Sequence, residues 1–121
     1  MTKKRAWTIF SKYLRLKYAD WRGNVKCCTC NKTRMWNDRI DAGHFISRRH
    51  NATLFDERNV HPQCKGCNMN SGEPVKYYQF MEEKYGVKVI NELYKLSKTS
   101  KSFTKQELIE MTDKWRKETK I

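Results

Sequence analysis

The chain has 121 residues, enough for one domain with a modest core, and 26 Lys and Arg against 13 Asp and Glu give it a formal charge of +13. Its apolar stretches are far shorter than the ~20 residues of a membrane-spanning helix, and no secretory signal follows the basic N-terminus. The four tryptophans argue against a disordered basic tail. We therefore expect a folded cytoplasmic protein whose charge favours nucleic acid as its partner.

The N-terminal segment predicts a basic amphipathic helix over about residues 3–20. Trp7, Phe10 and Leu14 recur at helical spacing, and lysines and arginines occupy much of the remaining surface. A stripe of this kind usually packs into a core. We expect residues 1–23 to form this helix and its end.

Five cysteines fall into two groups. Cys27 and Cys30 form one C-x2-C pair, and Cys64 and Cys67 form another. Two such pairs supply the four thiolates of a tetrahedral zinc site, and disulfides are rare in chains without a secretion signal. We expect a structural Zn²⁺ that stabilises a small core, with Cys28 as a spare thiol.

Between residues 24 and 69 the helical period is lost, and short strands are expected. Residues 40–46 predict one strand, and residues 58–63 predict a second. Three helices should follow, beginning near Pro74, at Val87 and at a capping box formed by Thr104 and Glu107. Residues 95–105, rich in Lys, Ser and Thr, form a linker-like stretch too short to separate domains.

The segment between the cysteine pairs carries the most informative residues. His44 ends a predicted strand, Asn59 follows 15 residues later, and Asn68 comes directly after the second cysteine pair. This set resembles the HNH, or ββα-metal, nucleases. The run AGHFISRRHNATLFDERNVHPQCKGCN, with FSKYLRLKYADWRGNVKCCTCNK before it, also resembles the phage NinG/Rap recombination nuclease family over about residues 10–115.

The resemblance implies an α+β fold with a ββα-metal (HNH, His-Me finger) core, stapled by the four-cysteine zinc site and flanked by N- and C-terminal helices. One nuclease domain would cover residues 1–121, with the core in residues 24–72 and the C-terminal helices in residues 73–121. It also implies a structure-selective, metal-dependent DNA endonuclease that cuts branched recombination intermediates such as Holliday junctions and D-loops. A phage-encoded protein would act in the host cytoplasm.

Symmetric cleavage of a junction takes two active sites, so a homodimer is a further expectation. The terminal helices offer apolar stripes for its interface.

The catalytic roles follow from chemistry and from the resemblance. His44 is the expected general base, because a neutral imidazole accepts a proton from water. The reaction also needs a cation, Mg²⁺ or Mn²⁺, and Asn68 is its first expected ligand by similarity to the phage junction resolvase endonuclease VII. Asp41 gives a D-x-G-H spacing similar to the DRGH motif of non-specific ββα nucleases. It either binds the cation, directly or through water, or braces the hairpin, since strand alternation points it away from His44.

The remaining candidates are assigned by position. Asn59 is expected to brace the loop that carries His44. His61 should share a strand face with Asn59, where it either ligates the cation, touches the scissile phosphate or simply packs. Arg48 and Arg49 are candidate clamps for phosphate oxygens, or else a solvated charge pair. His50 receives no role.

Two other functions stay open at this point. One is a sequence-specific HNH nicking or homing-type endonuclease, and the other is a non-catalytic zinc-ribbon module that binds DNA. The positive charge supplies affinity for phosphates without reading sequence, and no helix carries Asn, Gln and Arg arranged for base edges. This favours selection by DNA structure. Cleavage of branched but not linear DNA would separate the three functions.

Overall fold

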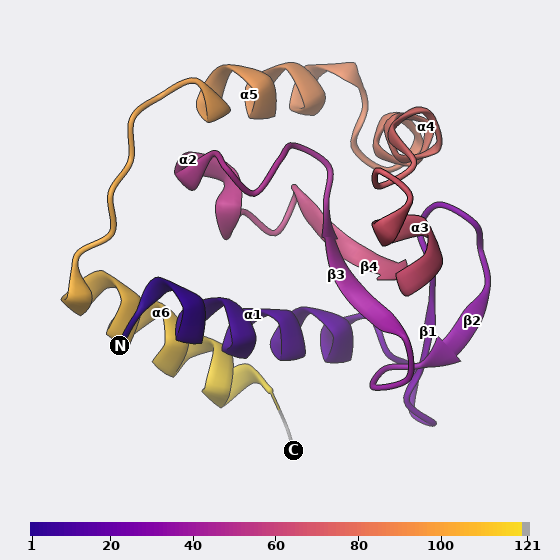
Figure 1. Cartoon of the computed structure of the whole chain (residues 1–121), viewed down its shortest axis with the longest axis horizontal. Helices are drawn as coiled ribbons and strands as arrows, with labels where there is room; N and C mark the ends of the chain where they lie inside the picture. Colours follow the sequence, from indigo (N-terminus) through magenta and orange to yellow (C-terminus); the bar gives the residue numbers. More distant parts are fainter. Residues whose placement is uncertain (120–121) are drawn as a thin grey trace.

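The computed structural model describes residues 1–119, so the last two positions of the expected 1–121 domain lie outside the described residues. The expected α+β class is confirmed. The elements, in chain order, are α1 (Lys3–Lys17), β1 (Asn24–Lys26), β2 (Thr33–Met35), β3 (Ile40–His44), α2 (Asn51–Leu54), β4 (Val60–Cys64), α3 (Lys65–Met69), α4 (Pro74–Tyr85), α5 (Val87–Ser97) and α6 (Lys105–Glu118) (Figure 1).

Two separate antiparallel hairpins form the strands. The β1–β2 hairpin carries the first cysteine pair in its turn, and the β3–β4 hairpin lies at the centre of the molecule (Figure 1). In β3–β4, Gly43 lies opposite His61 and His44 lies opposite Val60. Because side chains alternate along a strand, His44 and His61 belong to opposite faces of this hairpin.

Helix α1 covers one face of the central hairpin. Thr2 caps it by accepting a hydrogen bond from the Arg5 backbone N–H, as short hydroxyl side chains do at helix starts. Phe10 is fully buried, and its ring centroid lies 4.7 Å from that of Trp115 on α6. The apolar stripes of the two terminal helices therefore bury each other inside one chain. This corrects the expectation that they offer a dimer interface.

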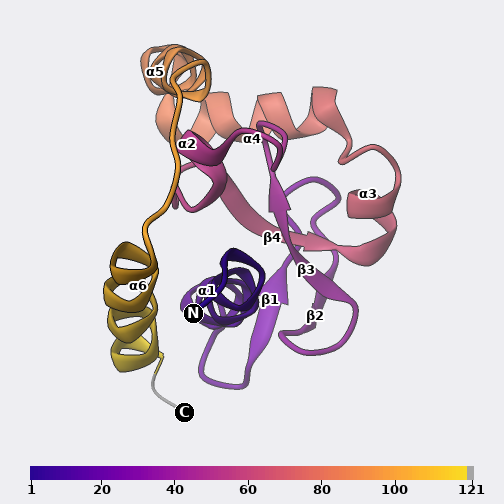
Figure 2. The same cartoon turned by 60° about the vertical axis from the view of Figure 1, so that its left-hand side comes forward.

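Helix α4 packs on the other face, where Tyr77 contacts His61 and the Gly43 carbonyl, and α5 packs on α2 and α4 (Figure 2). The core residues of α4 and α5, Tyr77, Met81, Ile90 and Leu93, cluster with Ile46, which follows β3. The predicted boundaries hold, because each rests on a local signal. Helix α4 begins at Pro74 and ends before Gly86, whose φ of 87° suits glycine, and α6 begins at the predicted capping box.

The α5–α6 connector, residues 98–104, joins helices at two ends of the molecule without regular structure (Figure 2). Within residues 1–119, none of the helices is both long enough and apolar enough to cross a membrane.

Candidate metal centre and active site

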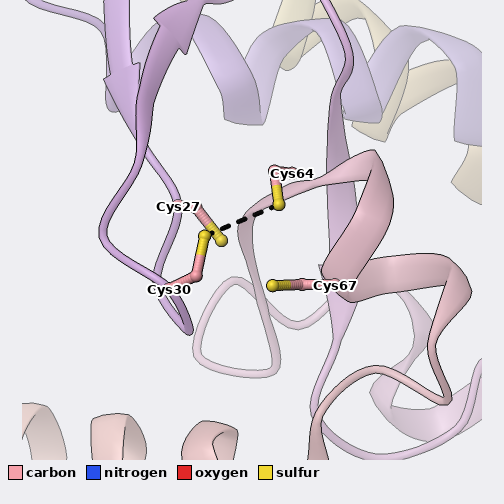
Figure 3. A group of neighbouring side chains, drawn as sticks. All are labelled: Cys27, Cys30, Cys64 and Cys67. Carbon is pink, nitrogen blue, oxygen red and sulfur yellow. Dashed lines mark hydrogen bonds between the residues drawn. The ribbon is translucent and has the colours of Figure 1, made fainter.

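The four predicted zinc ligands come together. Cys27 and Cys30 approach from the β1–β2 turn, Cys64 from the end of β4 and Cys67 from α3 (Figure 3). Their Sγ atoms all lie within 4.8 Å of one another, and those of Cys30 and Cys64 are 3.6 Å apart. Tetrahedral thiolates at about 2.3 Å from zinc are separated by about 3.8 Å. The cluster could therefore hold one such ion.

The thiols also need a cation to ionise together. Burial opposes the charge on Cys27, but hydrogen bonds from the Thr29 hydroxyl and from backbone N–H groups lower its pKa to about 6. Burial raises the pKa of Cys67 to about 12. Four thiolates this close repel one another, and a divalent metal removes that penalty. Cys28 stands outside the cluster, and burial raises its pKa.

A cavity of about 340 Å³ lies beside β3, and it contains three of the predicted site residues. His44 reaches it from the end of β3, Arg48 from the following loop and Asn68 from α3. The full lining is Ala42, His44, Phe45, Ser47, Arg48, Asn68, Ser71 and Gly72, with no acidic side chain among them. Cys67 immediately precedes Asn68, so the cysteine cluster fixes α3, and with it Asn68, against the hairpin.

His44 is held in one tautomer. Its Nε2 lies 3.0 Å from the backbone carbonyl oxygen of Leu54. A carbonyl oxygen only accepts hydrogen bonds, so Nε2 carries the proton and Nδ1 keeps a lone pair. The Trp7 ring stacks on the imidazole, with centroids 4.7 Å apart. Burial, aided by the nearby Arg48 charge, lowers the pKa of His44 to about 4, so the ring is neutral at pH 7 and able to accept a proton.

Asn59 ties together the loops that support His44. It is fully buried, and its Oδ1 accepts a hydrogen bond of 2.7 Å from the Ile46 backbone N–H. Its Nδ2 donates to the backbone carbonyls of Ile46 and Thr53, both at 3.1 Å. Asn59 thus connects the segment after β3 to α2, whose Leu54 carbonyl orients His44. It does not line the cavity.

Asp41 lies next to Asn68 and outside the cavity lining. The Nδ2 of Asn68 donates to Asp41 Oδ2 at 3.1 Å, and Lys65 Nζ lies 3.9 Å from Asp41 Oδ1. Because the amide nitrogen of Asn68 points to a carboxylate, its Oδ1 is the atom left to bind a cation. Asp41 orients that amide.

The ring nitrogens of His61 are far less available to a ligand than those of His44. It is fully buried on the face covered by α4, where Nδ1 lies 3.0 Å from the Tyr77 hydroxyl and Nε2 lies 2.8 Å from the Tyr85 hydroxyl. Both ring nitrogens are engaged, and the residue does not line the cavity. Of the three expectations for His61, the packing one matches its surroundings.

The two candidate arginines, Arg48 and Arg49, line different hollows. Arg48 lines the cavity, with its guanidinium carbon 5.2 Å from the centre of the Trp7 ring. Arg49 is exposed and lines a different hollow, together with His50. Sequence reasoning missed two supports of His44. Trp7 was assigned only to the core stripe of its helix, and the Leu54 carbonyl is a backbone group that leaves no signature in a sequence.

Comparison with known proteins gives the chain a family. The model of the family described as "Bacteriophage Lambda NinG protein" matches residues 2–121. This chain belongs to the NinG family. The expected likeness to NinG is thereby confirmed. Protein ninG of Salmonella phage P22 is 33% identical over 72 residues, which cover 58% of this chain and 34% of that relative. The chain thus spans about a third of the length of this curated NinG relative. No solved structure matches.

Proposed function

We propose that this NinG-family chain is a divalent-metal-dependent DNA endonuclease that hydrolyses phosphodiester bonds in branched recombination intermediates. The observation that carries the proposal is the shared cavity. It contains a neutral His44 with a free Nδ1, the amide of Asn68 and the guanidinium of Arg48. The choice of branched DNA rests on the sequence resemblance to the NinG/Rap nucleases.

The proposed catalytic frame is a ββα-metal core made of β3, β4 and α3. In this frame a structural Zn²⁺ on the four cysteines joins the end of β4 to α3. Support comes from the order of residues. Cys64 ends β4, and Cys67 directly precedes Asn68. The zinc site would therefore set the position of the Asn68 amide relative to the His44 imidazole.

The chemistry assigned to the cavity is hydrolysis with an external water. His44 Nδ1 accepts a proton from that water while the Leu54 carbonyl holds the proton on Nε2. The water oxygen forms a bond to phosphorus, the bond from phosphorus to the leaving oxygen breaks, and that oxygen takes a proton from solvent. Arg48 can bind the non-bridging phosphate oxygens through two N–H groups.

A general base supplies about 10²–10⁴-fold, which falls well short of what phosphate-ester cleavage requires. A bound Mg²⁺ or Mn²⁺ supplies the rest by polarising the phosphate and stabilising the leaving oxygen. Its proposed ligands are Asn68 Oδ1 and, through water because it lies outside the cavity lining, Asp41. Both offer the oxygen atoms that these cations prefer.

The proposal extends to assembly and place. Paired cuts in a junction need two active sites, so we propose that two copies act together, through a surface other than the buried stripes of α1 and α6. Light scattering with and without junction DNA tests this, and a monomer in both conditions would contradict it. The proposed place of action is the host cytoplasm, where replicating phage DNA lies.

The test is a nicking assay on a synthetic four-way junction, a flap and a linear duplex with Mg²⁺ or Mn²⁺. We expect the two branched substrates to be cut and the duplex to stay intact. Asn68→Ala should abolish nicking, whereas Asn91→Ala, on an exposed position of α5, should not. Equal cutting of the duplex at a fixed sequence would favour a sequence-specific nickase. Binding without any cutting would favour a zinc-ribbon binding module.

A further inference from the structure

Two further hollows continue from the reaction cavity. One, of about 180 Å³, lies over the first turns of α1 and shares Arg48 with the cavity. The other, of about 500 Å³, lies between the loop at Arg49 and residues 97–101 of the α5–α6 connector. Lys3 links them, because its Nζ donates to Asn51 Oδ1 at 3.1 Å and Asn51 lines the second hollow. We call these three neighbouring hollows the groove: the first two share Arg48, and the third is joined to them through the Lys3–Asn51 hydrogen bond.

The groove carries charge of one sign. No Asp or Glu lines any of its three parts, whereas six lysines and arginines do: Lys3, Lys4, Arg48, Arg49, Lys98 and Lys101. The overall charge of the protein does not explain this. A separate hollow, near Trp21, is lined by both Asp20 and Glu118. The hollow near Phe103 continues from the far end of the groove, with which it shares Asn51 and Lys101, and it brings in one acidic side chain, that of Asp56. The three parts named above are therefore basic, and the first acidic side chain lies beyond the connector.

The groove also contains neutral polar side chains, although the Thr99 hydroxyl already donates its proton to the Leu96 carbonyl at 2.7 Å. Asn51, Thr99 and Ser100 line its far end, and Asn51 Nδ2 donates to the Lys101 backbone carbonyl at 3.0 Å, which holds the connector in place. Lys101 itself pairs with Glu107 at 2.7 Å, outside the groove, so Lys98 is the connector cation more available to a ligand. Short polar side chains and lysines bind backbone oxygens and read no base sequence.

We propose that this groove binds the phosphates of the DNA arm that leads to the scissile phosphate. The strand would run from the cavity past Arg48 and the first turn of α1 to the α5–α6 connector. The choice of DNA as the ligand rests on the proposed function. The α5–α6 connector then has a role in substrate binding. The N-terminal lysines Lys3 and Lys4 share this role and are not merely solvated.

The experiment compares two triple variants of the full, zinc-loaded chain. Lys3→Gln/Lys4→Gln/Lys98→Gln removes three cations from the groove. Lys32→Gln/Lys88→Gln/Lys114→Gln removes three exposed lysines that line none of its parts. Binding to a labelled four-way junction is measured by fluorescence anisotropy, without divalent cation, over about 50–300 mM KCl.

The groove variant should bind at least tenfold more weakly at about 100 mM salt, and its slope of log K against log salt should be shallower by about 3, because each lost phosphate contact removes about one released counterion. The slope measured for the control variant should change by less than a third as much as the slope measured for the groove variant. Replacing the same three groove lysines with arginine should restore wild-type binding. The loss should be equal for junctions of unrelated sequence.

Equal losses in the two triple variants would overturn the groove, since only net charge would then matter. A groove variant that binds like the wild-type chain would overturn it as well. The readout keeps this failure separate from that of the proposed function. A chain that binds through the groove but never nicks contradicts the nuclease, whereas one that nicks while both triples bind alike contradicts the groove.

Discussion

Two histidines on opposite faces of the β3–β4 hairpin, His44 half-buried and His61 fully buried, show how partners decide what an imidazole can do. Burial lowers the pKa of both, to about 4 for His44 and to about 3 for His61. His44 uses one nitrogen for a backbone carbonyl and lines the cavity, whereas His61 gives both nitrogens to tyrosine hydroxyls. The same side chain with the same neutral charge leaves one ring nitrogen unengaged on one face, where we propose that it acts as a base, and serves packing on the other.

Removing the metal should abolish the difference between the two faces, because the cysteine cluster holds together the β1–β2 turn, the end of β4 and α3. Structural zinc sites supply an apparent ~10–16 kcal/mol, which exceeds the net stability of most small domains. We expect a strong chelator to unfold the chain, with loss of helical circular dichroism. Cys27→Ser should prevent stoichiometric zinc binding, whereas Cys28→Ser, outside the cluster, should retain it. A chelated chain with an unchanged spectrum would contradict a structural metal.

Exchanging the two histidines for alanine should separate catalysis from stability. His44→Ala should lower junction nicking by about 10²–10⁴-fold, because the proposed general base is lost, with only a small change in melting temperature. His61→Ala should do the reverse. It leaves a buried void and a Tyr85 hydroxyl without its His61 partner, whereas the Tyr77 hydroxyl keeps its hydrogen bond to the Gly43 carbonyl. We expect this to cost about 2–4 kcal/mol, while the folded fraction still nicks.

Asn91→Ala, on an exposed position of α5 outside the groove, is the control for both. If His61→Ala removed nicking from protein shown to be folded, the assignment of His61 to packing would be wrong.

Gly43 lies between the two faces, opposite His61 and next to His44. A Cβ at this position would meet Gln63 Oε1 at 2.1 Å. Gln63 is fully buried and donates to the Gly72 carbonyl at 2.7 Å, so it cannot swing away without losing a bond. We expect Gly43→Ala to cost about 1–3 kcal/mol in urea unfolding, as overpacked sites do. Gly66→Ala, whose Cβ would meet nothing within 4 Å, should be neutral.

How far the sequence predicts this molecule depends on how local each signal is. The ends of α4 and α6 follow from Pro74, Gly86 and the Thr104 capping box, which act within one turn. The cysteine cluster follows from spacing, because each C-x2-C pair is a turn in itself. Helices α2 and α3, with four and five residues, are too short to show a period, and neither was predicted as an element.

The candidate site also contains some residues that the sequence predicts and some features that it does not. His44 and Asn68 were predicted through a resemblance to a known arrangement, and they share a cavity. The features that distinguish His44 from His61 were not predicted, because they depend on packing between distant segments. Tyr85, 24 residues after His61 in the sequence, contacts the His61 ring, and Trp7, in the N-terminal helix α1, stacks on the His44 ring. An Asn or His in a strand pattern does not reveal which face it will occupy until the helices that cover each face are placed.

The smallest expected effect is the pH dependence of folding stability, to which His44 and His61 should both contribute. In the unfolded chain an imidazole takes up a proton near its ordinary pKa of 6.5, whereas in the folded chain His61 stays neutral until about pH 3. Between these values the unfolded state binds more protons, so stability rises with pH and is lost as the solution is acidified. Each such histidine should contribute a slope of up to about 1.4 kcal/mol per pH unit below pH 6.

Urea unfolding at pH 7, 6 and 5 in zinc-saturated buffer measures this slope, and the difference between variant and wild type cancels acid release of the metal. His61→Gln does not titrate and should flatten the profile by about that amount. His44→Gln should do so to a similar extent, although only His44 is proposed to take part in cleavage. His50→Gln, on an exposed side chain, is the control and should leave the profile unchanged. A wild-type slope retained in His61→Gln would mean that His61 does not stay neutral in the folded chain. Equal flattening of the pH profile in His44→Gln and His61→Gln would show that the two histidines differ in geometry and not in charge.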